Sequence, residues 1–565
     1  MKYKVLADCY EELERTSSKL MKIKILAELY LKASEKDLPK IVLLSQSRVF
    51  PKYVEIELGM ATQLTMRAIA RATGFSEREV ERFYRELGDL GLTAERCVKN
   101  KKQATLFKKT LTVDYVFKRL QDIGKAVGEG SQEKKLMILT ELLLNSEPKE
   151  AKYIIRTVLG ELRIGVAGGI VRDAIAEAFL VKKGIPKAKA VEAVEYAWNV
   201  LSDFSEVAVI ALTAGLQGLK NVKPVLGRPI QVMLGIKAES IEEVLKRHPK
   251  VIVEYKYDGM RLQVHKRGNK VWLFTRRQEN VTKQFPDIVE YIQKYIKAEE
   301  CIVEGEAWPI DPKTKTPLPF QKLSQRIQRK YDIHKMMKEI PVQLNLFDMV
   351  YLDGKTLFDK PLIERIKILG SIVKQVQGKI MIAERIITSD LKEIEEFYHK
   401  ALRLKQEGIM IKNPNSPYIF GRHVGGWYKI KPTMETLDLV IVGATWGEGR
   451  RAKWLSSYVL AVRDPDTGEF LTCGMMGTGL TEEQFEKMTQ ILKPLIIEES
   501  GREVKVKPKI VVEVGYQEIQ KSPNYESGYA LRFPRLIRVR NDKGPEDVDT
   551  LNRLAELYKS QGKEG

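Results

Sequence analysis

The chain has 565 residues, of which 44% are hydrophobic, so its length predicts about three domains with substantial cores. Its 95 lysines and arginines against 75 aspartates and glutamates give a formal net charge of +20, which favours a polyanionic partner such as nucleic acid. The cysteines are widely spaced and no stretch approaches about 20 consecutive apolar residues, which argues against a disulfide framework, a zinc finger and a membrane span. We therefore expect a cytoplasmic protein. The abundance of charged residues has an alternative explanation, a densely ion-paired surface of the kind found in heat-stable proteins.

Residues 1–220 are predicted to form an all-α domain. Apolar residues recur at helical spacing around Leu136 and Leu143, and the run 188–216 behaves similarly. Ser131 follows a glycine-rich turn and is expected to be the N-cap of a helix whose start could bind phosphate. The segment 160–174 combines glycines with arginines, which fits either close approach to a DNA minor groove or tight helix packing.

Residues 221–432 are predicted to form an α+β domain after a linker that contains prolines and a glycine. The segments 262–266 and 271–275 flank Gly268 and Asn269, a turn signal that predicts a hairpin. The segments 302–308 and 342–351 are further predicted strands.

Residues 433–565 are predicted to form a small β-barrel of the OB type. The segments 437–442 and 458–462 alternate as strands do, and a helical tail is expected over 547–560.

A lysine stands at the end of one predicted strand in the middle region. The β-branched run 251–253 predicts a buried strand, and Asp258 with Gly259 predicts a turn immediately after Lys256. A lysine amine becomes a nucleophile only where cations or burial depress its pKa. Taken alone, Lys256 is better explained as a solvated turn residue.

The residues around it in the sequence change that balance. Charged and aromatic side chains follow in order, nearly all on predicted strands or their ends: Lys256, Arg261, Arg276, Glu304, Glu306, Phe347, Asp348, Glu407, Lys412, Lys429 and Lys431. Cationic groups can neutralise a triphosphate, glutamates can hold Mg²⁺ and a phenylalanine can stack on a purine. No P-loop signature is present, and neither His265 nor His423 has a metal-ligand partner at useful spacing.

Six motifs in order carry a family resemblance over almost the whole chain. They are Lys256–Arg261, Thr275–Asn280, Glu304–Glu306, Phe347–Asp348 followed by Glu407–Lys412, Trp427–Lys431, and Arg532–Lys543. In these motifs the chain resembles the ATP-dependent DNA ligases of the archaeal and eukaryotic replicative type, within the covalent nucleotidyltransferase superfamily. It departs from the family at 231–235, where the linker sequence differs, and at Met260, which replaces a small or polar residue.

The resemblance implies a role for each matching residue. Lys256 would carry AMP as a phosphoramidate. The ATP-binding residues would be Glu254, Arg261, Arg276, Glu306, Phe347, Arg422, Lys429, Lys431, Arg540 and Lys543, and the Mg²⁺ ligands would be Glu306 and Glu407. Phe347 could instead be a core residue, and Arg422 lies in a stretch whose length varies in the family. The implied partner is nicked double-stranded DNA, with a sliding clamp as a candidate second partner and a monomer as the expected state.

Other functions remain as alternatives. An RNA ligase or an mRNA capping guanylyltransferase would share the lysine motif, but the helical domain ahead of it resembles only the DNA ligases. A catalytically silent DNA-binding clamp would not need Lys256, Glu306 and Glu407. An NAD-dependent ligase would carry a four-cysteine zinc module.

Overall fold

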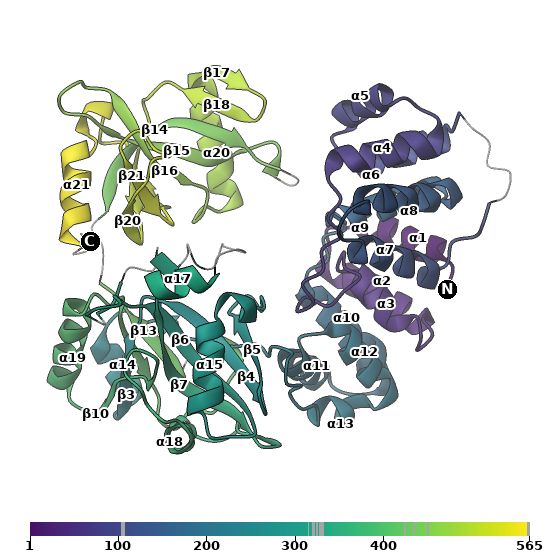
Figure 1. Cartoon of the computed structure of the whole chain (residues 1–565). Helices are drawn as coiled ribbons and strands as arrows, with labels where there is room; N and C mark the ends of the chain where they lie inside the picture. The colour runs from purple at the N-terminus through teal and green to yellow at the C-terminus, as the bar shows by residue number, and fades with distance from the viewer. Residues whose placement is uncertain are drawn as a thin grey trace.

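The computed structural model describes residues 1–102, 108–314, 316–318, 322–323, 326, 333–422, 425–432, 436–448 and 451–561, with backbone alone at 333–335 and 422. Figure 1 shows a helical region, a central region of two sheets and a strand-rich region. The predicted architecture of an all-α, an α+β and an OB-type barrel region is confirmed, whereas the boundaries at 220 and 432 stay predictions.

The helical region packs its helices around one apolar core, in which Tyr3, Tyr10 and Tyr30 are fully buried. Its helices are α1 (Tyr3–Arg15), α2 (Lys19–Lys32), α3 (Leu38–Leu44), α4 (Thr62–Thr73), α5 (Glu77–Leu87), α6 (Leu90–Lys99), α7 (Val113–Lys125), α8 (Ser131–Asn145), α9 (Pro148–Val158), α10 (Gly168–Phe179), α11 (Lys187–Leu201), α12 (Phe204–Thr213) and α13 (Gly215–Lys220).

Two details of this region differ from the prediction. Ser131 is the first residue of α8, and the N-cap is Gly130, whose φ of 73° suits a glycine. The run 188–216 is divided among α11, α12 and α13, because Ser202 takes a φ of 53° and the Asp203 side chain caps α12 by accepting from Ser205 N.

The glycines of the segment 160–174 are not explained by tight helix packing alone. A Cβ placed on Gly160 or Gly169 would meet no atom within 4 Å. Gly160 has a φ of 73°, which accounts for a glycine there without any ligand. Contact of this segment with DNA stays a prediction.

The central region holds two antiparallel-rich sheets. One has the order β10-β3-β11-β13-β2 and the other β5-β4-β6-β7-β8, with β9 beside β7. The strands are β2 (Ile236–Lys237), β3 (Val251–Lys256), β4 (Met260–Arg267), β5 (Lys270–Thr275), β6 (Glu300–Pro309), β7 (Val342–Leu352), β8 (Lys355–Thr356), β9 (Ile380–Ile382), β10 (Arg385–Thr388), β11 (Gly408–Lys412) and β13 (Trp427–Ile430). The predicted hairpin is confirmed as β4 and β5.

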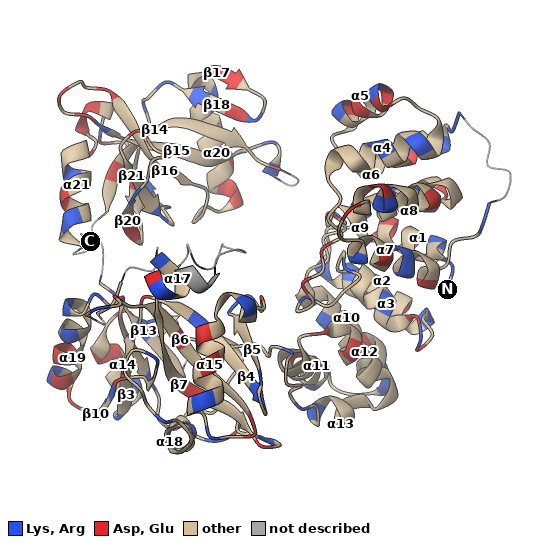
Figure 2. Cartoon of the chain, viewed as in Figure 1, with Lys and Arg blue, Asp and Glu red and all other residues tan. Residues whose placement is uncertain are grey.

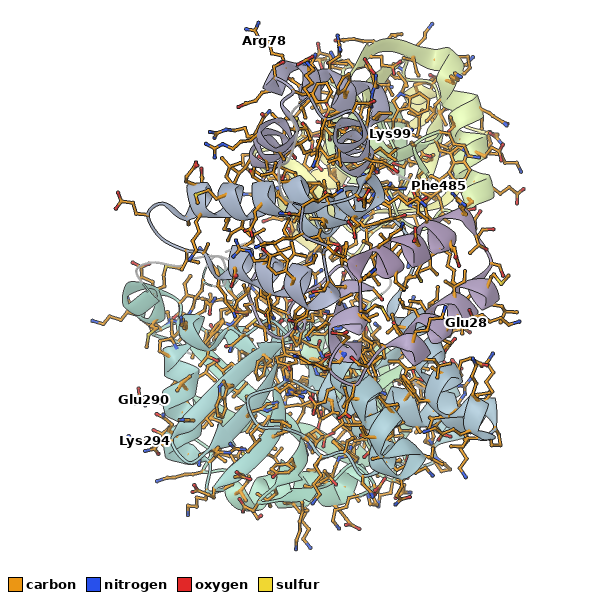
Figure 3. The ribbon with its side chains drawn as sticks, turned by 90° about the vertical axis from the view of Figure 1, so that its right-hand side faces the viewer. Glu28, Arg78, Lys99, Glu290, Lys294 and Phe485 are labelled. Atoms are coloured by element: carbon orange, nitrogen blue, oxygen red, sulfur yellow. The ribbon has the colours of Figure 1, made fainter. Side chains whose placement is uncertain are left out.

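Short elements join and cover these sheets. The pair β1 (Met233–Leu234) and β12 (Gly421–Arg422) is parallel. The helices are α14 (Ile241–Arg247), α15 (Pro286–Tyr295), α17 (Ile333–Glu339), α18 (Leu362–Ile372) and α19 (Leu391–Arg403). In Figure 3 the charged side chains of Glu290 and Lys294 on α15 project from the surface, as does Arg78 on α5, which is typical of solvated helix faces.

The strand-rich region closes around its own core. One sheet runs β16-β15-β14-β18-β17, with β19 beside β14 and β22 beside β19, and β20 pairs with β21. Its elements are β14 (Leu437–Trp446), β15 (Leu455–Arg463), β16 (Phe470–Met476), α20 (Glu482–Leu492), β17 (Ile496–Ser500), β18 (Glu503–Val506), β19 (Val511–Gly515), β20 (Glu518–Lys521), β21 (Tyr529–Arg532), β22 (Arg535–Val539) and α21 (Leu551–Ser560). Register shifts within β14 and β15 bend these strands.

Charges of both signs are spread over all three regions in Figure 2. The four cysteines are free. Among the described residues, no helix combines the length and the apolar character that crossing a membrane requires.

Candidate active site

Lys256 stands at the end of β3, where the strand meets its neighbour β11. Lys256 lies opposite Gly408, and Glu407 N donates a backbone hydrogen bond of 2.9 Å to Lys256 O. A Cβ at Gly408 would lie 2.2 Å from Ile430 O, and its φ is 135°, so only glycine allows this crossing. The backbone therefore fixes Lys256 beside Glu407.

Glu407 is a carboxylate shared by two lysines. Its Oε2 lies 2.6 Å from Lys256 Nζ and also pairs with Lys431 Nζ. Burial opposes ionisation, but the two ammonium groups prevail and lower the pKa of Glu407 to about 2. Burial and the neighbouring Lys256 lower the pKa of Lys431. The site thus holds one negative group between two cations.

Glu306 approaches the same lysine from the second sheet. It lies opposite Arg261 in the pairing of β4 with β6. Burial raises the pKa of Glu306 to about 7, against the opposing charges of Lys256 and Arg261. A Cβ at Gly259 would lie 2.5 Å from Ala307 O and 2.9 Å from Glu306 Cγ, so the turn after Lys256 needs glycine for this close approach.

The other end of the site is aromatic. Phe347 and Trp427 meet edge to face with ring centroids 5.8 Å apart, and Lys412 Nζ lies 4.5 Å and 4.3 Å from their ring centres. Glu254 is buried and pairs with Lys412 at 2.5 Å and with Arg385 at 2.9 Å. Phe347 is nearly buried and also lines the cavity, so it is both a core and a site residue.

Arg261 is held by the linker and by a buried carboxylate. Its Nη1 donates to Met233 O and its Nη2 to Glu304 Oε2, each at 2.7 Å. The buried Nε has no hydrogen-bond partner among the described residues. Through Met233 the divergent linker 231–235 still contacts the site, by its backbone.

The same network reaches the linker by a second route. Gln263 Nε2 donates to Glu304 Oε1 at 3.3 Å, and Gln263 Oε1 accepts from Ile230 N at 2.8 Å. His265 Nδ1 accepts from Gly227 N at 3.3 Å, and its Nε2 lies 3.0 Å from Gln263 Oε1. Because Nδ1 is an acceptor, the ring proton lies on Nε2 and the imidazole is neutral.

His265 provides a test of this network through the pH dependence of stability. Burial lowers the pKa of His265 to about 3 from 6.5, so its stabilising contribution is complete above pH 6.5 and is lost as pH falls toward 3. Relative to His265→Asn, the free energy of unfolding of the wild type should fall by about 2 kcal/mol between pH 6.5 and pH 5. Urea unfolding at each pH measures it, and His399→Asn, at an exposed position of α19, is the control. Parallel curves for wild type and variant would contradict the buried neutral ring.

Lys256, Glu306 and the aromatic rings line one cavity of about 860 Å³, a volume typical of a small-molecule site. Its walls are Lys52, Leu234, Gly235, Glu254, Tyr255, Lys256, Tyr257, Gly259, Met260, Arg261, Thr275, Arg276, Arg277, Glu279, Glu306, Phe347, Met410, Lys412, Trp427 and Lys429. Seven of the predicted ATP-binding and catalytic residues therefore line the cavity: Glu254, Lys256, Arg261, Arg276, Glu306, Phe347 and Lys429. Lys431 is connected to Lys256 by Glu407, with which both lysines pair.

Two predicted residues lie elsewhere. Arg540 Nη1 donates to both carboxylate oxygens of Asp438 at 3.0 Å, and Lys543 Nζ donates to the same residue at 2.7 Å. These cations are thus neutralised inside the barrel region and do not line the cavity. The side chain of Arg422 lies outside the described part of the structure.

The donor set suits a hard divalent cation held partly by a nucleotide. Among the described residues no group of three or more His, Cys, Asp and Glu side chains could hold a metal ion by itself. Mg²⁺ commonly takes one or two carboxylates and completes its shell with water and substrate phosphates. Glu407 and Glu306, beside Lys256, match that requirement.

Sequence reasoning missed Lys52, Arg385 and the contribution of Trp427. Arg385 and Lys52 come from segments far from any motif, so nothing in the local pattern indicated them. Trp427 lies in the fifth motif, and its place two residues before Lys429 on a strand puts both on one face.

Comparisons with known proteins agree with this geometry. Residues 232–431 match the family described as ATP dependent DNA ligase domain, residues 2–176 match DNA ligase N terminus, and residues 451–543 match ATP dependent DNA ligase C terminal region. A DNA ligase of Nanoarchaeum equitans is 47% identical, with 99% of each chain covered. A DNA ligase of Thermococcus onnurineus is 46% identical, with 99% of this chain and 98% of that protein covered. The solved structure Pmar-Lig_Pre. is 16% identical with a TM-score of 0.58, covering 95% of this chain and 99% of that one, which shows a shared fold.

Proposed function

Since the chain belongs to the family of ATP-dependent DNA ligases, enzymes that seal nicks in DNA, we propose that Lys256 is the amine that carries AMP from ATP to the nick. One observation supports this assignment above the others. Lys256 Nζ lies at the wall of a nucleotide-sized cavity, 2.6 Å from Glu407 and beside Glu306.

The proposed reaction has three steps. Lys256 Nζ, once deprotonated, attacks the α-phosphorus of ATP, forming an N–P bond while the bond to the β-phosphate oxygen breaks and pyrophosphate leaves. An oxygen of the nick's 5′-phosphate then attacks the same phosphorus, and the N–P bond breaks. The 3′-hydroxyl finally attacks the 5′-phosphorus, loses its proton and releases AMP.

The cavity supports distinct roles for its two ends. The rings of Phe347 and Trp427 are suited to stacking on adenine, with Glu254 as a polar contact to the base. Arg261 retains an unpartnered Nε, and Arg276 lies on the same wall, so both can donate to phosphate. Lys429 and Lys431 are the proposed contacts to the α-phosphate, and Glu306 the contact to the ribose hydroxyls.

Mg²⁺ is the proposed metal, held by Glu407 and Glu306. When bound, it would neutralise charge on the transferred phosphate. Arg540 and Lys543 are proposed to orient the leaving pyrophosphate, which requires that they exchange Asp438 for phosphate and that the barrel approach the cavity.

The direct test of the proposed function is formation of the covalent intermediate. With ATP labelled at the α-phosphate, the protein should acquire a label that is stable to base and lost in acid, as a phosphoramidate is. An adduct formed with GTP instead of ATP would favour a capping guanylyltransferase, and no adduct with either nucleotide would refute the assignment.

DNA binding by the full chain is expected to depend steeply on salt. A protein that contacts roughly 6–10 phosphates loses about 10³–10⁵-fold in affinity between 50 and 200 mM salt, because each contact releases counterions. The net charge of +20 predicts a loss in this range for nicked duplex. Fluorescence anisotropy across a salt series measures it, and intact duplex of the same length is the control. Salt-insensitive binding would contradict phosphate contacts as the source of affinity.

A sliding clamp as a partner, a monomeric state and a cytoplasmic location stay predictions of the sequence.

A further inference from the structure

A loop of the helical region reaches the cavity of the central region. This loop, residues 46–61, connects α3 to α4, and its Lys52 is one of the residues that line the cavity with Lys256. Lys52 is exposed, and none of the carboxylates described in the structure forms an ion pair with it. No family motif includes this residue.

The loop is attached to the central region by two residues that follow Lys52, Tyr53 and Glu55. Glu55 Oε1 accepts a hydrogen bond of 2.5 Å from Asn280 N, at the end of the segment that carries Arg276. The guanidinium of Arg228 lies 5.0 Å from the centre of the Tyr53 ring and pairs with Glu206. These contacts place Lys52 at the cavity wall that Arg276 and Arg277 form.

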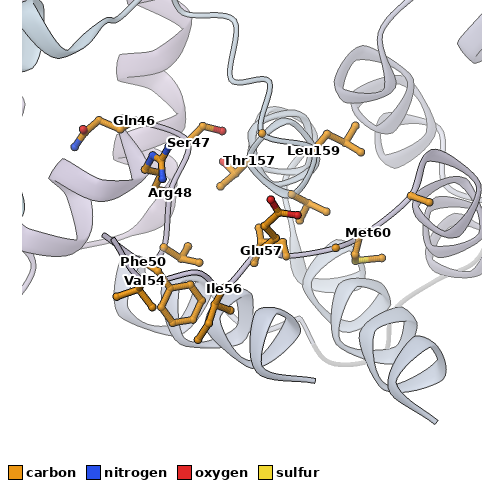
Figure 4. Close-up of a pocket in the computed structure, with 16 residues that line it drawn as sticks. Gln46, Ser47, Arg48, Phe50, Val54, Ile56, Glu57, Met60, Thr157 and Leu159 are labelled. Carbon is orange, nitrogen blue, oxygen red and sulfur yellow. The ribbon is translucent and has the colours of Figure 1, made fainter. Parts of the chain in front are cut away.

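The loop is also fixed to its own region, as Figure 4 shows for its apolar side chains. A Cβ on Gly124 of α7 would lie 2.9 Å from Phe50 and 3.0 Å from Ile56. Gln121 Nε2 donates to Val49 O at 3.0 Å. Lys52 is thus presented by a packed loop, which lowers the entropy cost of using it in binding.

The position of Lys52 defines which part of a nucleotide it can meet. The aromatic rings and Glu254 occupy one part of the cavity, whereas Arg276 and Arg277 belong to the segment that Glu55 contacts. The cavity has the volume of a small-molecule site, about 860 Å³. A cavity of this size accommodates a nucleotide, whose phosphates can lie beside Lys52.

We propose that Lys52 is a phosphate-binding residue of the first step, contributed by the helical region, which holds the β- and γ-phosphates of ATP while Lys256 attacks the α-phosphorus. The inference rests on the proposed function of Lys256. It gives the helical region a part in nucleotide binding in addition to any contact with DNA. Glu55 is then a positioning residue, acting through Lys52.

Single-turnover self-adenylation of the full chain tests the proposal. Lys52→Ala should raise the apparent Kd for ATP about tenfold, as expected for one lost charge-assisted hydrogen bond at an accessible wall, with the rate at saturation within about twofold of wild type. The concentration of pyrophosphate needed to discharge the adenylylated enzyme should rise by a similar factor. Lys52→Arg should retain most of the affinity. Lys36→Ala, an exposed lysine of the same region, is the matched control.

Glu55 variants separate positioning from charge. Glu55→Ala should weaken ATP binding severalfold, whereas Glu55→Gln, which keeps an oxygen acceptor for Asn280 N, should restore it. If Glu55 acts through Lys52, adding Glu55→Ala to Lys52→Ala should produce no further loss. Equal additive effects of the two substitutions would contradict this coupling.

Sealing of a nick that already carries AMP distinguishes the two sources of phosphate. This step uses no ATP, so Lys52→Ala should leave it within about twofold of wild type. Loss of this step with unchanged self-adenylation would overturn the proposal, because the ligand would then be the nick's 5′-phosphate. Unchanged requirements for ATP and pyrophosphate would also overturn it, whereas failure of the wild type to form an adduct would refute the proposed function instead.

Discussion

Lys256→Ala is expected to abolish labelling of the protein by α-labelled ATP, a loss of at least about 10³-fold, because it removes the amine that would form the N–P bond. Lys429, which also lines the cavity, and Lys431, which pairs with Glu407, belong to the end of another strand, β13. The gel assay for the acid-labile adduct measures the effect. Lys256→Arg keeps the charge and should fail equally, since a guanidinium is not nucleophilic at neutral pH.

A step-specific control accompanies this variant. Sealing of a nick that already carries AMP does not require an amine nucleophile, so Lys256→Ala should retain that step while losing the overall reaction. An adduct of normal yield in Lys256→Ala, mapped to a different lysine, would show that the nucleophile has been assigned wrongly.

Glu407→Gln is expected to reduce self-adenylation by about 10²–10³-fold, the loss typical of removing one charged group from the transition-state environment. The substitution preserves shape but leaves the ammonium groups of Lys256 and Lys431 facing each other. Both lysines are about a quarter exposed, so the cost in stability should be about 1–3 kcal/mol, less than for a fully buried pair. Glu364→Gln, which alters a surface ion pair with Lys360, is the matched control. It should change neither the rate of self-adenylation nor the free energy of unfolding.

The stability difference between wild type and Glu407→Gln should decrease as the pH falls. The pKa of Glu407 is lowered from 4.5 to about 2, so its stabilising effect is complete above pH 4.5 and is lost as pH falls toward 2. The difference in the free energy of unfolding between wild type and Glu407→Gln should therefore shrink below pH 4.5. A difference that stays constant down to pH 2 would contradict the shared ion pair.

Much of the site could be predicted because its chemistry lies at strand ends. Lys256 follows a β-branched run, and motif order marks Glu407 as a site residue. The pairing of β11 with β3, which brings the two residues together, is found only in the structure. Lys429 and Lys431 follow from the same reasoning. Family resemblance and three-region architecture are confirmed, whereas the individual roles stay proposals.

Other parts depend on contacts between distant segments, which no local pattern records. Arg261 was predicted as a phosphate ligand, yet two of its donors are used by Met233 O and Glu304. Lys52 is separated from Lys256 by some two hundred residues, and only packing brings them to one cavity. Ser131 has the sequence of an N-cap, but it is the first residue of α8, and the N-cap is Gly130 with a φ of 73°, a conformation that glycine tolerates.

The ion pairs of Asp438 bear on which anions could bind Arg540 and Lys543. Arg540 and Lys543 both donate hydrogen bonds to the carboxylate of Asp438, which lies at the start of β14, the first barrel strand. On their proposed role, any anion that recruits these cations must compete with Asp438, so we expect a dense cluster of negative charge to displace it more readily than a lone monophosphate. The proposed engagement of the barrel would then have a charge threshold set by Asp438, a residue of the barrel itself.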